Sequence, residues 1–370
     1  MLPLKKVQFD LPSLIVTLFL ALEILSFFFL NKSFFDFAFI FIGLVIFATQ
    51  FKYIVNYKIG MFMLFLITAG YSFFILYAFQ GRITTIPLRL IMHFSLLILL
   101  IRYRINQLYI KILLYIFVAY TFFYTLVLGQ TLRGMLAGGS ENFVGWLALS
   151  LGVYYYLLCY VNKDKMKLQV AIVVLIAAIS YLGRGTIGGA IILFAAVTFY
   201  LISSKPLKYK IFVFLVISLF STVLLLSDTI SEISNLAFRK FNEKGIDLDE
   251  RDMILRDYID RINLQTFFTG ISPDHYPFTL HHGNFHNSYL LVHSQFGLIG
   301  AMFIGLILLT FLLKIWKSPF LCLLLLSISL RVFTDVIAYI GYIDFFIFYH
   351  LYIIWNNNYL KKRMKLNFVK

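Results

Sequence analysis

Histidines are concentrated in residues 275–293, where five of the seven lie. His282 and His286 are four residues apart, as ligands of a helical metal site would be, but no carboxylate between them completes a HExxH pattern. We therefore predict no metal site in this segment. A neutral imidazole can instead take a proton from a hydroxyl near neutral pH, so His286 is a candidate general base. His293 lies seven residues further on and could share a helix face with it.

Arginines are the second group of residues that could do chemistry. Arg184 lies between glycines and between two apolar runs. Exposure of its charge to lipid would cost on the order of 3 kcal/mol or more, so it faces a cavity or an anion, or reaches back to the headgroups. Arg251, Arg256 and Arg261 recur every five residues, which rotates a helix by about 140° each time. They cannot share one face, so at most one or two of them reach a given site, and surface ion pairs are the alternative.

The composition shows what kind of environment must hold these residues. Of the 370 residues, 61% are hydrophobic and 13% are charged, whereas soluble domains have roughly 45–50% and about 25%. Too little polar surface remains to cover a water-soluble globule. We predict an all-α, polytopic integral membrane protein. Its net charge of +15 then reports orientation in the bilayer and not a nucleic-acid partner.

Twelve apolar runs predict about twelve transmembrane helices. They lie at 12–30, 34–51, 60–79, 86–101, 109–128, 143–161, 168–183, 186–202, 209–227, 288–313, 319–340 and 343–356. If the N-terminus is cytoplasmic, alternate loops and the C-terminal tail hold most of the 32 Lys and Arg residues. The short loops of the other side hold only Lys32, Arg82, Arg133 and Arg184. This bias follows the positive-inside rule, so both termini are expected in the cytoplasm.

Residues 228–287 form one long hydrophilic stretch, which this topology places on the periplasmic side. Two amphipathic helices are expected in it, one beginning near Asp228 and the other near Asp247. Their apolar residues are Ile230, Ile233, Ala237 and Phe241 in the first, and Ile254, Tyr258 and Ile262 in the second. We expect both to fold over the membrane domain, and a solvated tether is the alternative. The chain thus divides into residues 1–227 with nine helices, the loop at 228–287, and residues 288–370 with three helices and a basic tail.

A few charged residues lie inside the apolar runs. Arg331 and Asp335 are four residues apart in the eleventh run, so we predict an internal ion pair between them. Arg89 and Glu23 are interpreted in the same way, as charges with a structural role.

Three short elements follow one another along the chain. His286-Asn287 is followed by nine residues and then by Gly297-Leu298-Ile299-Gly300. Upstream lie Gly183-Arg184-Gly185 and the segment from Arg251 to Phe268-Thr269-Gly270. In this order and topology they resemble the HN-x9-GxxG signature, the Ser-Arg-Gly element and the Arg-led loop segment of the bacterial O-antigen ligase and polymerase superfamily. The resemblance covers about residues 170–315, with Gly183 in place of the usual serine and Ser272 where the family's Gly-x-Gly has its second glycine.

The resemblance implies an enzyme that moves a glycan from undecaprenyl diphosphate to a sugar hydroxyl without a metal or other cofactor. It assigns His286 the role of base. It assigns Arg184 and Arg251 the role of stabilising the departing diphosphate, because an arginine fork bonds phosphate oxygens in pairs. Polar neighbours are expected to bind substrate: His282, Arg256, Asn287 and Tyr289.

The family member that we expect is an O-antigen (repeat-unit) polymerase of the bacterial inner membrane, with its active site facing the periplasm. Its partners would be the donor and acceptor linked to undecaprenyl diphosphate, membrane lipid and a chain-length regulator protein, and no nucleic acid. Two alternatives stay open. One is the ligase that transfers finished polysaccharide to lipid A core. The other is a flippase or secondary transporter, although transporters usually carry internal repeats and this sequence has none that we detect.

Overall fold

The secondary structure is helical throughout the described part of the chain. The computed structural model describes residues 10–26, 28, 32–82, 84–131, 142–181, 184–203, 206, 248–272, 285, 287–333 and 344–356. Within these ranges there is no β-strand. The all-α class predicted from the apolar runs is confirmed for this part of the chain.

Eleven of the twelve expected ranges contain a helix, and the twelfth, 209–227, lies outside the described residues. The helices are α1 (Leu11–Ser26), α2 (Lys32–Tyr57), α3 (Ile59–Phe74) with the π-helical turn η1 (Ile75–Phe79), α4 (Ile86–Arg102), α5 (Gln107–Phe122) with η2 (Phe123–Val127), α7 (Asn142–Asn162), α8 (Leu168–Ser180), α9 (Arg184–Ser203), α15 (Ser288–Lys314), α16 (Pro319–Phe333) and α17 (Phe345–Trp355). Among the described residues six helices are long and apolar enough to cross a membrane: α2, α3 with η1, α5 with η2, α7, α9 and α15. Such helices indicate a membrane protein.

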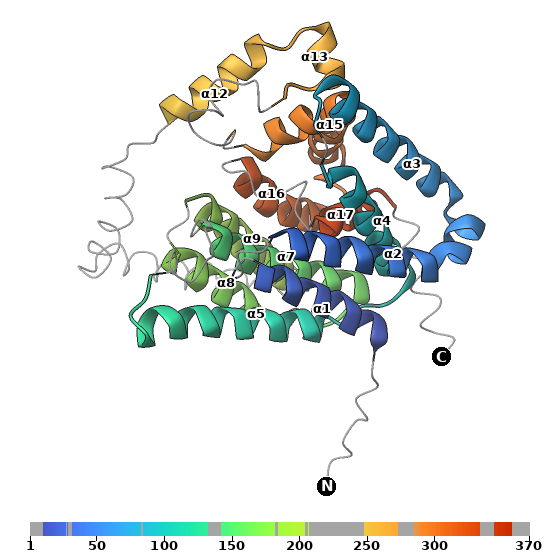
Figure 1. The fold of residues 1–370 in the computed structure, drawn as a ribbon. Coiled ribbons are helices and arrows are strands. Elements are labelled where there is room, and N and C mark those ends of the chain that lie inside the picture. The colour runs from blue at the N-terminus through green and yellow to red at the C-terminus, as the bar shows by residue number, and fades with distance from the viewer. Residues whose placement is uncertain are drawn as a thin grey trace.

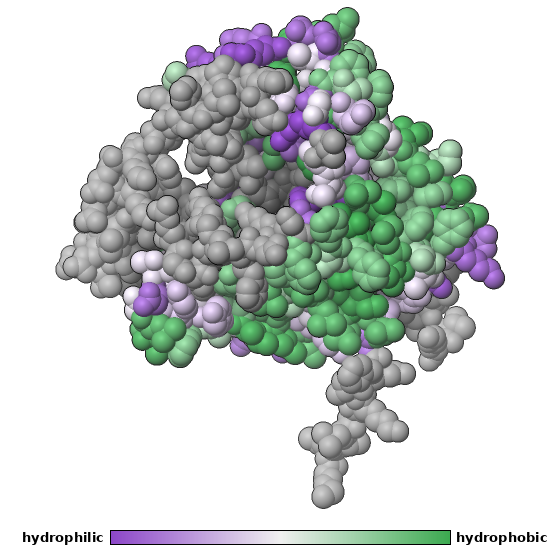
Figure 2. Space-filling model, viewed as in Figure 1, coloured by the Kyte–Doolittle hydropathy of each residue, from purple (hydrophilic) through white to green (hydrophobic). Residues whose placement is uncertain are grey.

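Much of the surface of the bundle is apolar. α7 is the central helix, because its apolar stretch is 94% buried and it packs against α5, α8, α9 and α16. On the outside, Phe37, Phe41 and Ile116 are 68%, 67% and 62% exposed. Figure 2 shows a broad hydrophobic surface over the helices, with hydrophilic residues gathered at the top of the view. Apolar surface of this extent fits a covering of lipid.

Two helices of the long hydrophilic stretch lie together at one end of the bundle, α12 (Leu248–Asp260) and α13 (Leu264–Thr269) (Figure 1). α12 confirms the second amphipathic helix, since Ile254 and Tyr258 are both 1% exposed. The prediction is wrong at Ile262, which is 38% exposed. The chain leaves α12 before that residue and starts α13, where Asn263 and Thr266 form a capping box. The first expected amphipathic helix, at 228–241, lies outside the described residues.

The expected span at 288–313 is bent. Gly297 interrupts α15 with φ 48° and ψ −125°, in a region that favours glycine. A Cβ on Gly300 would lie 2.5 Å from the carbonyl oxygen of Val292, so the segment after the bend folds back closely on the segment before it. Apolar residues dominate on both sides of His293-Ser294-Gln295, and no charged residue lies between Ser288 and Phe311, which is why hydrophobicity alone predicted a single span.

Candidate functional site

The two glycine elements noted in the sequence contact each other where α13 crosses α15. A Cβ on Gly297 would lie 1.9 Å from the carbonyl oxygen of Phe268, and a Cβ on Gly270 would lie 2.3 Å from that of Ser294. Gly270 also has a positive φ of 72°. Only residues without a side chain permit this approach of backbone to backbone. The glycines therefore allow the C-terminal end of α13 to lie against the bend of α15.

His293 joins three elements at this crossing. Its Nδ1 lies 2.8 Å from the hydroxyl of Tyr258 on α12, and its Nε2 lies 3.2 Å from the carbonyl oxygen of Phe267 on α13. A carbonyl only accepts, so in the neutral ring Nε2 carries the proton and Nδ1 accepts from Tyr258. Both side chains are buried, at 6% and 1% exposed. The ring of Tyr258 also packs edge-on against Phe285, the residue before His286, with centroids 5.3 Å apart.

Tyr71 of α3 and Gln80, the residue after η1, also bond the backbone where α13 crosses α15. The hydroxyl of Tyr71 donates to the carbonyl oxygen of Phe268 at 2.6 Å. The amide of Gln80 donates to the carbonyl oxygens of Thr269 at 3.2 Å and of Ser294 at 2.7 Å. No motif in the N-terminal half of the sequence points to Tyr71 or Gln80. For His293, the seven-residue spacing from His286 is the feature of the sequence that indicates a role beside the candidate base.

Two of the predicted substrate-binding residues lie at the start of α15 and contact the protein itself. Asn287 caps the helix, since its Oδ1 accepts from the backbone N–H of Tyr289 at 2.8 Å and of Leu290 at 3.4 Å. The hydroxyl of Tyr289 donates to the carbonyl oxygen of Ser329 on α16 at 3.3 Å. These contacts give both residues a structural role and place the start of α15 beside the end of α16.

The end of α16 in turn lies beside the start of α9. The guanidinium Nε of Arg331 donates to the hydroxyl of Thr186 at 2.9 Å, and Arg331 is 2% exposed. One turn further from the end of α16, the two helices also pack closely. There the hydroxyl of Ser327 donates to the carbonyl oxygen of Gly189 at 2.7 Å. The pair predicted between Arg331 and Asp335 stays a prediction, since Asp335 lies outside the described residues.

Two of the predicted catalytic residues lie on helices described above. Arg184 is the first residue of α9 and Arg251 lies in the first turn of α12, with only their backbone described. His282 and His286 lie outside the described residues, between α13 and α15. The contacts of their described neighbours bring the starts of α9 and α15, the end of α16 and the helix α12 to one end of the bundle.

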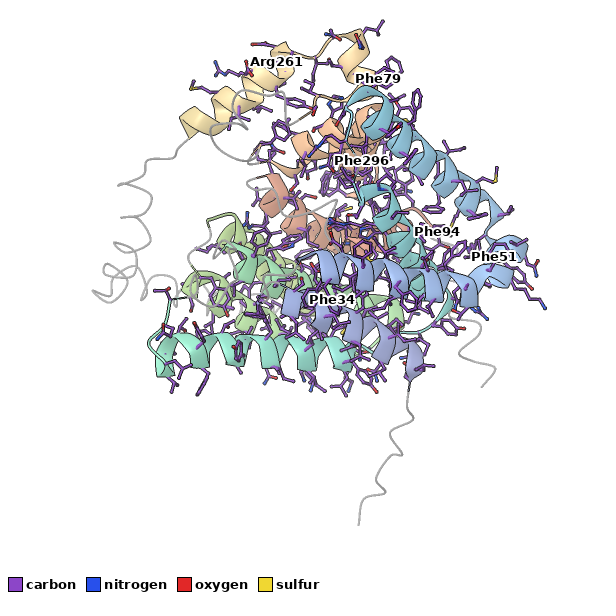
Figure 3. All side chains as sticks on the ribbon, in the orientation of Figure 1. Phe34, Phe51, Phe79, Phe94, Arg261 and Phe296 are labelled. Atoms are coloured by element: carbon purple, nitrogen blue, oxygen red, sulfur yellow. The ribbon has the colours of Figure 1, made fainter. Side chains whose placement is uncertain are left out.

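The other two loop arginines are exposed on or just after α12. Arg256 is exposed on α12. Arg261 pairs with Asp257 one turn earlier, at 2.9 Å, and its side chain is 43% exposed. Figure 3 shows Arg261 on the outer surface of the loop helices. For Arg261 the surface ion pair named as the alternative is therefore the correct interpretation, and such a pair contributes little to stability.

An apolar cavity of about 280 Å³ lies below the crossing, between α3, α4, α15 and α17. Its aromatic and aliphatic walls include Leu64, Phe65, Phe94, Phe296, Phe303 and Phe348. Figure 3 shows Phe94 and Phe296 on the side of the bundle that α3 covers. Thr68 and His93 are the polar side chains in its lining. Leu64 is 65% exposed, so the cavity reaches the apolar surface beside α3.

A separate group of charges lies in the bundle itself. The guanidinium of Arg89 on α4 bonds the carboxylate of Asp36 on α2 at 2.7 Å. Glu23 of α1 is 3% exposed. The interpretation of Arg89 as a structural charge is confirmed by its ion pair, although its partner is Asp36, 53 residues away in the chain.

None of the protein-family models, curated proteins or solved structures compared with this chain matches it.

Proposed function

We propose that this chain is an O-antigen polymerase of the bacterial inner membrane, with both termini in the cytoplasm and its active site facing the periplasm. The resemblance of three sequence elements supplies the family. The observation that carries the proposal is a chain of contacts between four helices. Arg331 of α16 bonds Thr186 at the start of α9. Tyr289 at the start of α15 bonds the end of α16, and His293 of α15 bonds Tyr258 of α12. α9, α12 and α15 begin in or directly after the three segments in which the resemblance places the base and the cations, and α16 links α9 to α15.

The reaction would be a single displacement at an anomeric carbon. The hydroxyl at the non-reducing end of a new repeat unit on undecaprenyl diphosphate gives its proton to His286 and attacks the growing chain. A carbon–oxygen bond forms as the bond from the anomeric carbon to diphosphate breaks. Undecaprenyl diphosphate leaves with the electron pair, and its charge is stabilised by Arg184 and Arg251. The product has the inverted configuration.

The apolar cavity supports a substrate that carries a long hydrocarbon chain. Val292 and Phe296 line it from the first segment of α15, on which His293 also lies. A polyprenyl tail in this cavity would leave its diphosphate at the end of the bundle where the helix ends meet. Apolar walls match an apolar chain, and burial of that chain stabilises the complex in proportion to the area that it covers.

A deletion strain tests the proposal against its two alternatives. Loss of polymer, with single repeat units still attached to lipid A core, is the expected result. Loss of all attached glycan would identify the ligase, and repeat units held on the cytoplasmic side would identify the flippase. Gel analysis of the lipopolysaccharide separates the polymerase from the two alternatives. The side of the membrane on which lipid-linked glycan accumulates then separates the ligase from the flippase.

A substitution in the same strain tests the proposed base. His286→Ala should abolish chain extension, because it removes the group proposed to take the proton from the hydroxyl, while the protein stays inserted at wild-type levels. Polymer of wild-type length from this variant would remove His286 from the mechanism. Arg104→Gln is a suitable control, because Arg104 is exposed and pairs with Asp164 at 3.0 Å away from the loop helices.

A further inference from the structure

We infer that Lys58 and Lys314 form a binding site for the headgroup of an acidic phospholipid, at the end of the bundle opposite to the candidate functional site. Lys58 caps the start of α3 and Lys314 is the last residue of α15. The crossing of α13 and α15 lies at the other end of both helices. The inference does not depend on the proposed function, because the two sites share no residue.

Aromatic side chains of the last turn of α17 hold the two ammonium groups. Nζ of Lys58 donates to the hydroxyl of Tyr352 at 3.2 Å and lies 5.5 Å from the centroid of its ring. Nζ of Lys314 lies 4.5 Å from the ring centroid of Trp355. The indole N–H of Trp355 donates to the hydroxyl of Thr310 at 2.8 Å, which fixes the ring. Tyr352 and Trp355 are three residues apart, so cations from two helices meet on one face of α17.

The helices around these two lysines have no carboxylate that could balance their charges. The sequence has no Asp or Glu at 37–140, 275–334 or 345–370, and these ranges include α3, α4, α15, α16 and α17 in full. Among the described residues Lys314 has no hydrogen-bond or ion-pair partner, and Lys58 has only the hydroxyl of Tyr352. A ring or a neutral hydroxyl orients an ammonium group without neutralising it. N–H donors of both lysines therefore remain for an anion.

The surroundings of the site fit a phospholipid better than a soluble anion. Exposed apolar side chains continue from the two lysines along both helices, at Ile59, Met63 and Ile67 of α3 and at Leu308 and Leu312 of α15. Figure 2 shows this apolar surface next to hydrophilic residues at the turn between α2 and α3. Acyl chains can cover the apolar side chains while the phosphate binds the ammonium groups. The predicted orientation places this end in the cytoplasmic leaflet, where each such lysine favours an acidic lipid by about fivefold.

Quenching of tryptophan fluorescence in vesicles tests the inference. The full chain is reconstituted in dioleoyl phosphatidylcholine with rising fractions of either phosphatidylglycerol or phosphatidylcholine that carries brominated acyl chains. The ratio of the two quenching curves gives the preference for the acidic lipid. Trp355 reports on the site, because Trp316→Phe removes the other exposed indole and Trp146 is buried.

All lysine variants are compared in this Trp316→Phe background. We expect Lys58→Gln and Lys314→Gln each to lower the preference by about fivefold. Lys58→Arg keeps the charge and should keep the preference. Lys52→Gln is the matched control, because Lys52 is exposed at the same end of α2 and its loss changes the net charge equally. It should leave the ratio unchanged.

Several results would overturn the inference. Equal quenching by the two lipids in the unsubstituted protein would show that the site has no preference. An unchanged ratio in both glutamine variants would show that the lysines do not bind the lipid. If Lys52→Gln lowers the ratio as much as Lys58→Gln, diffuse surface charge explains the preference, and a low ratio in Lys58→Arg would point to packing instead of charge. If one glutamine variant does not insert, the other decides. The deletion strain tests the proposed function separately.

Discussion

Tyr258 and His293 form a side-chain hydrogen bond between α12 and the bent helix α15. Both groups are withdrawn from water, and the second ring nitrogen of His293 is already occupied by a backbone carbonyl. The pair thus fixes the orientation of α12, which carries Arg251 in its first turn. In the proposed enzyme its role is to position the loop, because neither residue needs to touch the substrate.

Removal of the hydroxyl tests this role. Tyr258→Phe leaves Nδ1 of His293 buried without its donor, which should lower the free energy of unfolding by about 1–3 kcal/mol. Thermal unfolding in detergent, followed by tryptophan fluorescence, measures the change. Tyr57→Phe is the matched control, since Tyr57 is 73% exposed, and it should leave the melting temperature unchanged. Equal melting temperatures for all three proteins would show that the pair does not hold the loop helix.

At the scale of single residues, local spacing in the sequence does not predict the partners that come from other helices. Arg331 bonds Thr186 of α9, and its predicted partner Asp335 lies outside the described residues. Arg89 likewise bonds a residue of another helix. Local spacing cannot reveal such pairs, because they depend on which helices pack together. The same spacing rule succeeds for Arg261, whose partner Asp257 is exposed on the same helix.

The bend of α15 is the element on which the crossing depends. The first segment of α15 carries His293 and Ser294, both of which bond the elements around them, and the second segment continues into the apolar bundle. A straight helix of this sequence would carry those residues away from α13. The Gly-x-x-Gly spacing therefore has a physical reason that is independent of any family resemblance.

Alanine substitutions test the bend. Gly297→Ala adds a Cβ where the carbonyl oxygen of Phe268 lies 1.9 Å away, and it also strains a positive φ. We expect a loss of about 2–3 kcal/mol in the free energy of unfolding. Gly305→Ala is the control in the same helix, because nothing lies within 4 Å of its added Cβ. That variant should be neutral or more stable by up to about 1 kcal/mol, since alanine favours the helix.

Thermal unfolding of the two variants side by side gives the comparison. A Gly297→Ala protein as stable as Gly305→Ala would contradict the close contact between α13 and α15.

Hydrophobicity predicted which elements exist but not how they bend. Every expected apolar run that falls in the described residues contains a helix, because burial in lipid or in the bundle needs an apolar helix and little else. The short helix α13 was not predicted. It has six residues, and its start depends on the capping box of Asn263 and Thr266, which gives a weak signal in a sequence. The bend at Gly297 is set by a tertiary contact that no periodicity reports.

The whole molecule has two hydrophilic ends separated by an apolar surface. α12 and α13 lie at one end, and the turn between α2 and α3 lies at the other end of α3. The positive-inside bias assigns the loop end to the periplasm and the turn, with Lys52 and Lys58, to the cytoplasm. This assignment is a prediction for the molecule as a whole.

Cysteine labelling checks the orientation. Leu264→Cys and Tyr57→Cys place thiols at sites that are 79% and 73% exposed, at the two ends of α3. The native Cys159 and Cys322 are buried and should give little background. In spheroplasts, a maleimide that cannot cross membranes should label position 264 and not position 57. Both should label once the membrane is opened, and labelling of position 57 alone in intact spheroplasts would reverse the topology.

The attachment of α13 relies on the main chain of its last turn. Tyr71, Gln80 and His293 all contact carbonyl oxygens of Phe267, Phe268 or Thr269, and no side chain of those three residues is needed for the bonds. Substitutions at these positions can therefore accumulate without loosening the loop, provided that Gly270 is kept. Such an arrangement separates anchoring from recognition. The outward-facing side chains of α13 can therefore vary while the scaffold beneath them stays constant.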